Sequence, residues 1–264
     1  KIGIRPKVAI RVNPDFELKS SGMKMGGGPK QFGIDAESVP EVLKGIQSQD
    51  AEFIGFHIFS GSQNLKPDSI IESHDKTFEL AIRLSENLSA PIKKLNIGGG
   101  FGIPYFPGER RLDLAPIGDN LNELLASVKQ QLGGTRIVIE LGRYLVGEAG
   151  LYVARVIERK VSRGQAFLVT DGGLHHHLAA SGNFGQVIRK NYPVVIGNRI
   201  DSTDKESAMV VGPLCTPLDL LADKMMLSKA TEGDLVVVFQ SGAYGFTASP
   251  TRFLSHPEPV EIFI

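Results

Sequence analysis

Four short runs of nearly continuous apolar residues divide the first half of the chain at intervals of roughly 40 residues. They are Val8–Val12, Phe53–Phe59, Lys94–Ile97 and Arg136–Leu141. Runs without polar alternation are typical of parallel strands that are covered on both faces. The pattern therefore predicts four buried parallel strands.

Amphipathic stretches lie between these runs and predict helices over Ser38–Gln47, Asp68–Leu88 and Ile117–Gln131. The order is then βαβαβαβ with right-handed crossovers, an α/β arrangement. Four such units form either an open sheet or half of a closed eight-stranded barrel. The spacing favours half of a barrel.

The pattern changes at about residue 144. Short apolar runs separated by turn clusters follow, and few helices are indicated. The predicted strands are Tyr152–Ile157, Ala166–Val169, Met209–Val211 and Leu235–Gln240. We therefore expect a first domain over residues 1–143 and a β-rich domain over residues 144–264.

Composition narrows the possible partners. The chain has 264 residues, with 29 basic and 29 acidic side chains and one cysteine. This balance gives no electrostatic basis for binding nucleic acid or a membrane surface, and no apolar run approaches the length of a membrane span. A single cysteine excludes an intrachain disulfide and fits a cytoplasmic setting. Because the chain starts at Lys1 directly before a strand-like run, we expect a preceding segment.

Polar side chains and glycines gather where the four predicted strands end, and strand ends form the mouth that holds substrate in barrel enzymes. In chain order they are Arg11; His57, Ser60 and Ser62; Gly98, Gly99 and Gly100, continuing through Phe101 to Gly102; and Glu140 with Arg143. A glycine-rich turn lets backbone N–H groups approach a phosphate, but it is equally a plain tight turn. Ser62 is either a further phosphate ligand or a turn serine.

Other candidates also have two interpretations. Glu140 forms a structural pair with Arg143, or it faces a protonated heterocyclic nitrogen. Cys215 is an inert apolar thiol or an exposed loop cysteine, and Tyr244 is a phosphate donor or a turn aromatic. The run His175–His177 suggests a metal site, but the side chains of consecutive residues diverge, and no metal is expected.

Five ordered motifs together resemble the barrel-fold pyridoxal-phosphate decarboxylases that act on diaminopimelate, ornithine and arginine. They are residues 55–63 (GFHIFSGSQ), 96–102 (NIGGGFG), 140–143 (ELGR), 212–219 (GPLCTPLD) and 241–245 (SGAYG). The resemblance implies a (β/α)8 alanine-racemase-like barrel, of which only the second half is present, followed by a mainly β C-terminal domain. It also implies a homodimer with shared active sites.

The resemblance implies a role for each matching residue. Ser62, Gly98, Gly99, Gly100 and Tyr244 would hold the phosphate of pyridoxal 5′-phosphate. Glu140 would bind the ring nitrogen, Gly142 would contact the cofactor, and Arg143 would bind the phosphate or the substrate carboxylate. Cys215 would donate a proton in the partner subunit's site. Arg11, His57, Thr216 and Asp219 would support the pocket or the substrate.

The departures from the family pattern concern the cofactor and the substrate. The family's cofactor lysine lies on the first barrel strand, and no matching segment exists here. Phe59 stands where a histidine usually stacks on the cofactor ring, and Thr216 replaces an acidic residue that reads a distal amine. The pattern looks closer to exosortase-associated decarboxylases, or to those that act on an aminoacyl group of a carrier protein.

The function predicted is decarboxylation of an L-amino acid or an aminoacyl derivative, followed by protonation of the α-carbon. Glu140 favours this reaction over racemisation, because a carboxylate keeps the ring nitrogen protonated and deepens the electron sink. A catalytically inactive, decarboxylase-like binding protein is the alternative from another class.

Overall fold

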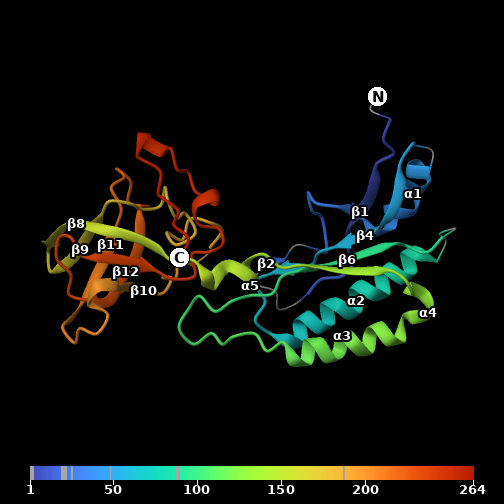
Figure 1. Cartoon of the computed structure of the whole chain (residues 1–264), viewed down its shortest axis with the longest axis horizontal. Helices are drawn as coiled ribbons and strands as arrows, with labels where there is room; N and C mark the ends of the chain where they lie inside the picture. The colour runs from blue at the N-terminus through green and yellow to red at the C-terminus, as the bar shows by residue number, and fades with distance from the viewer. Residues whose placement is uncertain are drawn as a thin grey trace. The chain divides into compact units, whose positions relative to one another are not determined.

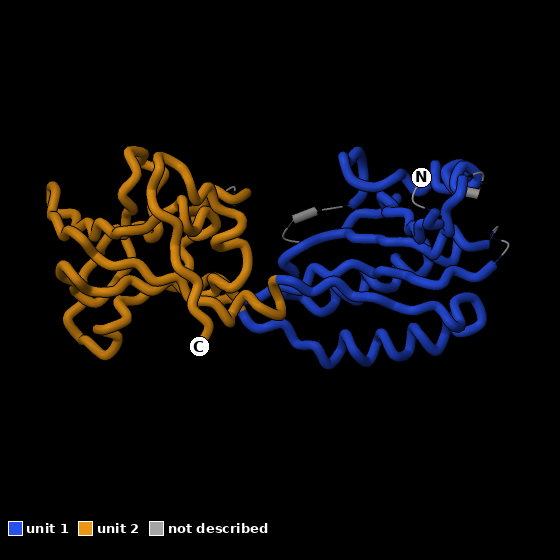
Figure 2. The backbone as a smooth tube through the Cα atoms, turned by 45° about the horizontal axis from the view of Figure 1, so that its top comes forward, with its two compact units in different colours: residues 1–103, 110–142 blue, residues 104–109, 143–264 orange. Residues whose placement is uncertain are grey.

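A computed structural model describes residues 3–18, 23–24, 26–47, 49–86, 88, 90–186 and 188–264. The chain divides into two compact units (Figure 2). Unit 1 comprises Lys1–Ile103 and Arg110–Gly142, and unit 2 comprises Pro104–Glu109 and Arg143–Ile264. The short segment 104–109 therefore belongs to unit 2, although the residues before and after it in the sequence belong to unit 1.

Unit 1 is built on a five-stranded parallel sheet in the order β3-β1-β4-β6-β7 (Figure 1). The strands are β1 (Lys7–Asn13), β3 (Ile34–Asp35), β4 (Glu52–Ile58), β6 (Lys94–Gly99) and β7 (Arg136–Glu140). The four predicted strands are confirmed, and β3 is an addition too short to leave an apolar pattern. A separate antiparallel ribbon joins β2 (Met23–Lys24) and β5 (Gly61–Ser62).

The three predicted helices are present, but their ends differ from the prediction. The first corresponds to the 3-10 turn η1 (Ala36–Ser38) followed by α1 (Val39–Gln47), and the second to α2 (Pro67–Ser85). The third corresponds to α3 (Ala115–Ser127) followed by α4 (Lys129–Leu132). α2 starts at Pro67, because proline suits the first helical turn, where its missing N–H has no partner to lose. The third predicted helix is broken at Val128, whose backbone leaves the helical region. α2 and α3 lie side by side on one face of the sheet (Figure 1).

The two faces of the parallel sheet differ in chemistry. Alternate residues of β1, β4 and β6 enter a buried core with the helices, as in Ile10, Phe56 and Leu95. The residues between them point to the opposite face. Arg11, His57 and Asn96 are direct neighbours across three strands on that face. The three nearly apolar strands therefore each contribute one polar side chain, and Arg11, His57 and Asn96 together form what we call the polar row.

Unit 2 contains a six-stranded sheet in the order β10-β13-β8-β9-β11-β12. Its strands are β8 (Tyr152–Ser162), β9 (Gln165–Thr170), β10 (Val194–Ile196), β11 (Lys205–Val211), β12 (Leu220–Ser228) and β13 (Leu235–Val238). The predicted mainly β character is confirmed, but β10 and β12 were missed. β12 breaks the strand pattern at Lys224, which has a positive φ and lies where the pairing with β11 shifts register.

The remaining elements of unit 2 are short. They are α5 (Arg143–Val146) and the 3-10 turns η2 (Gly147–Ala149), η3 (Gly197–Arg199), η4 (Phe246–Ala248) and η5 (Phe253–Ser255). Within the described residues, no helix combines the length and apolar character needed to cross a membrane.

The histidine run is packed inside unit 2. His175 and His177 are 0% and 1% exposed. His176 lies 3.1 Å from the Tyr152 hydroxyl and 2.8 Å from the Pro257 carbonyl oxygen, and His177 Nε2 lies 3.0 Å from Ser241 Oγ. Burial lowers the pKa of both His175 and His177 to about 4. His175 and His177 are therefore neutral packing groups of the β unit at neutral pH.

Candidate active site

Two residues of the polar row, His57 and Asn96, contact the side chain of Glu140 at the end of β7. His57 of β4 is the register partner of Asn96 of β6, and Gly99 of β6 is the register partner of Glu140. Because parallel strands end at one edge of a sheet, the glycine-rich turn and the carboxylate are brought to the same place. The sequence distance between them is spanned by α3 and α4.

Two side chains hold the Glu140 carboxylate. Asn96 Nδ2 donates a hydrogen bond of 2.7 Å to Oε1. His57 Nε2 lies 3.1 Å from Oε2, within ion-pair distance when the ring is protonated. Burial lowers the pKa of His57, with the charge of Glu140 opposing the shift. The side chain of Glu140 is itself 51% exposed, so its carboxylate is anchored yet open to a ligand.

The glycine-rich turn Gly98–Gly100, which begins at the end of β6, requires glycine at two positions. Gly98 and Gly100 have φ values of +73° and +90°. A Cβ at Gly100 would lie 2.1 Å from the Gly61 carbonyl oxygen. Asn64 ties this turn to the segment after β4, because its N–H donates to Gly100 O and its carbonyl accepts from Gly102 N. The two predicted phosphate segments are therefore packed together by their backbones.

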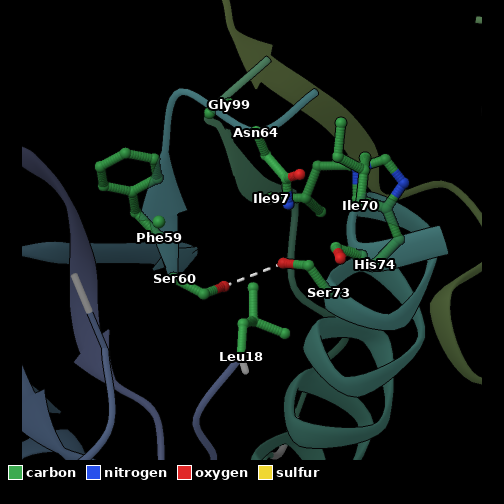
Figure 3. A pocket seen from close by; sticks show the side chains of 12 residues that line it. Leu18, Phe59, Ser60, Asn64, Ile70, Ser73, His74, Ile97 and Gly99 are labelled. Carbon is green, nitrogen blue, oxygen red and sulfur yellow. Dashed lines mark hydrogen bonds between the residues drawn. The ribbon is translucent and has the colours of Figure 1, made fainter. Parts of the chain in front are cut away.

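Phe59 lies against this turn. A Cβ at Gly98 would come within 2.8 Å of the Phe59 ring. Behind the turn is a cavity of about 10 Å³, room for about one water molecule. Figure 3 shows Phe59 and His74 on opposite sides of it, with the 2.9 Å contact between Ser60 Oγ and Ser73 Oγ joining the segment after β4 to α2. Ser62 follows in β5, where it pairs with Met23.

Arg11 reaches the same region from β1. Its guanidinium lies 4.8 Å from the centre of the Phe32 ring, and its charge contributes to the lowered pKa of His57. Arg11 is the register partner of His57, and its supporting role stays a prediction.

Unit 2 carries a second group of predicted residues. The guanidinium of Arg143, at the start of α5, lies 4.7 Å from the Tyr244 ring centre and 5.5 Å from that of Tyr105. Tyr244 has a φ of +57°, which is uncommon outside glycine and marks a constrained backbone. Tyr105 was not predicted from the sequence, because nothing in the segment 104–109 signals that it joins this group. A side chain at Gly142 would meet open space.

The predicted loop 212–219 is organised by its last residue. Asp219 is 3% exposed and accepts hydrogen bonds from the N–H groups of Leu174 and Leu214 at 2.6 and 2.9 Å. The Thr216 carbonyl accepts a hydrogen bond from the Asp219 N–H. This frame leaves Cys215 exposed at the loop tip. Asp219 supports the loop, and the chemical roles of Cys215 and Thr216 stay predictions.

The residues of unit 1 fit a pyridoxal phosphate molecule. An anchored carboxylate suits a protonated pyridine nitrogen, and a turn without side chains suits a phosphate. Phe59 offers an apolar ring face against that turn. These three features lie within one unit and depend on no contact between units.

Comparison with known proteins gives one family and one architecture. Residues 2–147 match the family described as pyridoxal-dependent decarboxylase, pyridoxal binding domain. L-glutamyl-[BtrI acyl-carrier protein] decarboxylase of Niallia circulans is 43% identical over 97% of this chain and 61% of its own length. Diaminopimelate decarboxylase of Aquifex aeolicus is 30% identical over 100% of this chain and 60% of its own.

A solved diaminopimelate decarboxylase from M. jannaschii, in complex with L-lysine, has the same fold with a TM-score of 0.85. It is 24% identical, and the match covers 98% of this chain and 58% of that one. The chain spans about three fifths of the length of these relatives.

The fold and the match define the second half of an alanine-racemase-like (β/α)8 barrel followed by a mainly β domain. The chain belongs to the pyridoxal-dependent decarboxylase family. The cofactor of that family is pyridoxal phosphate.

Proposed function

We propose that the protein catalyses pyridoxal-phosphate-dependent decarboxylation of an L-amino acid or of an aminoacyl group on a carrier protein. The observation that carries this proposal is the placement of Glu140 beside the turn Gly98–Gly100 through the β6–β7 register. One cofactor can contact both, with its ring nitrogen at the carboxylate and its phosphate at the turn.

The bound cofactor would supply an electron sink for the carbon–carboxylate bond. Glu140 would hold a proton on the ring nitrogen, and Phe59 would pack on the ring. Ser62 and the turn would bind the phosphate, with Arg143 and Tyr244 as further ligands of phosphate or substrate carboxylate. Arg11 and His57 would support Glu140. No observation favours racemisation or an inactive binding protein.

An aminoacyl carrier protein is the substrate class that we favour. The relative that is 43% identical carries such a substrate in its name. Thr216 stands where the family pattern has an acidic residue for a distal amine, so recognition of a free diamino acid lacks its usual charge. We further propose a cytoplasmic homodimer, in which Cys215 of one subunit serves the other subunit's site.

The proposal is tested with the full-length protein, whatever sequence flanks these 264 residues. The protein is loaded with pyridoxal phosphate and offered glutamate labelled in its α-carboxylate, either free or joined to a carrier protein through its side-chain carboxyl group. We expect release of labelled carbon dioxide, faster from the carrier. Release from neither glutamate form nor from free lysine, ornithine or diaminopimelate would overturn the proposed reaction.

Replacing Cys215 by alanine is expected to lower kcat about 100-fold with little change in KM, because a positioned general acid contributes on this scale. The measurement is steady-state decarboxylation by the full-length protein. Leu218→Ala is the matched control, since Leu218 is an exposed residue of the same loop. A Cys215→Ala protein with the parent kcat would exclude the thiol as the proton donor.

A further inference from the structure

A loop of unit 2 presents an aromatic side chain to solvent. This residue, Phe184, is 42% exposed. It lies between Gly182 and Gly185, whose φ values of +81° and +78° belong to the left-handed region that glycine adopts without strain. The side-chain amide of Asn183 donates a hydrogen bond of 3.1 Å to the Leu218 carbonyl oxygen, which joins two loops of the unit. The backbone that carries Phe184 is therefore held in place while its ring stays open to solvent.

The ring of Phe184 contacts a residue of the candidate site. Its centre lies 5.8 Å from that of Tyr244, at an interplanar angle of 38°. Tyr244 is itself 45% exposed, and the guanidinium of Arg143 lies 4.7 Å from its ring centre. Small-molecule sites typically combine aromatic walls with a few polar or charged groups. These three side chains all belong to unit 2 and supply both kinds of group at one place.

We propose that Phe184 determines substrate specificity by binding the arm through which a carrier protein holds its aminoacyl group. This inference rests on the proposed function, which makes Arg143 and Tyr244 ligands of the cofactor phosphate or of the substrate carboxylate. Phe184 extends the exposed aromatic surface of Tyr244 by one ring. A substrate held at Arg143 and Tyr244 therefore has the Phe184 ring beside it.

The possible substrates differ in chemistry at the end distant from the α-carbon. In free glutamate this end is a carboxylate, and in a diamino acid it is an ammonium group, so both need a charged or hydrogen-bonding partner. When the side-chain carboxyl group is joined to a carrier protein, the same end is neutral and continues into methylene and amide groups. An aromatic face binds such a chain through apolar contact. The Phe184 ring therefore suits the carrier-bound form and offers no partner to a free charge.

The test compares two forms of glutamate, both joined through the side-chain carboxyl group, with the full-length protein loaded with pyridoxal phosphate. One form is the glutamyl carrier protein, and the other is the methyl thioester, which has no arm. We expect Phe184→Ala to lower kcat/KM about tenfold for the carrier form, the scale of one lost aromatic contact, and to leave the methyl thioester within about twofold. Phe184→Tyr keeps the ring and should retain the parent kcat/KM with both forms. Met226→Ala is the matched control, because Met226 is an exposed apolar residue of β12 in the same unit.

The affinity of each variant for pyridoxal phosphate separates arm binding from simple packing on Tyr244. Arm binding leaves this affinity unchanged in Phe184→Ala, whereas a ring that only supports Tyr244 would weaken it and slow both substrates equally. Equal losses with the two forms, or an unchanged kcat/KM with the carrier form, would overturn the role of Phe184. The rate of the parent protein is a separate readout: if the parent decarboxylates neither form, it is the proposed function that fails, and the role of Phe184 with it.

Discussion

The Glu140→Gln variant of the full-length protein is expected to decarboxylate about 10³-fold more slowly, a loss of ~4 kcal/mol in transition-state stabilisation. Glutamine has nearly the same shape and can still contact Asn96 and His57. It carries no negative charge to keep a proton on the ring nitrogen, so the electron sink is weakened. The measurement is kcat with saturating cofactor.

The control is Glu52→Gln. Glu52 begins β4 at the opposite end of the same sheet, where it is paired with Lys93 at 2.5 Å. Its loss should leave kcat within about twofold, since an exposed ion pair contributes little to folding and this one lies away from the site. A Glu140→Gln protein that keeps more than a tenth of the parent rate would contradict the role of this carboxylate.

Acid is expected to destabilise unit 2 strongly, by several kcal/mol between about pH 7 and pH 4. Burial lowers the pKa of His175 and His177 from 6.5 to about 4. Between these two pH values the histidines of the unfolded chain bind protons and those of the folded chain do not. The free energy of unfolding therefore has its full value above pH 6.5 and decreases as the pH falls toward 4. Each ring contributes at most ~3 kcal/mol.

Urea unfolding of the β unit, followed by circular dichroism at several pH values, measures this loss. His175→Phe keeps an aromatic ring in the same packing but cannot titrate, so its stability should fall less steeply below pH ~6.5, by about half of the parent's loss. Equal acid dependence in parent and variant would show that His175 is not held neutral by burial.

The sequence predicted the parallel strands of unit 1 well because their apolar runs are dictated by burial on both faces. The sequence was a weaker guide to the strands of unit 2, where the apolar pattern is interrupted. β12 was missed because its pairing shifts register at Lys224, and β8 continues to Ser162 through residues 158–160, which are all charged. Glu158 and Lys160 are exposed and Arg159 is paired with Glu206, so burial imposes no apolar pattern on this part of the strand.

The residues of the candidate site likewise fall into those that the sequence predicted and those that it did not. Glu140 and Gly98–Gly100 stood out because a charge or a glycine run ending an apolar strand is unusual. Asn96 did not, since its significance depends on a partner 44 residues later that only the β6–β7 register brings close. Tyr105 was missed for a related reason, because its segment packs with unit 2 although its neighbours in sequence belong to unit 1.

The most direct test of the account is an experimental structure of the full-length protein with pyridoxal phosphate bound. We expect a carboxylate oxygen of Glu140 within hydrogen-bonding distance of the pyridine nitrogen, and the phosphate against the turn Gly98–Gly100. A ring nitrogen that contacts another group, with Glu140 turned to solvent, would contradict the assignment.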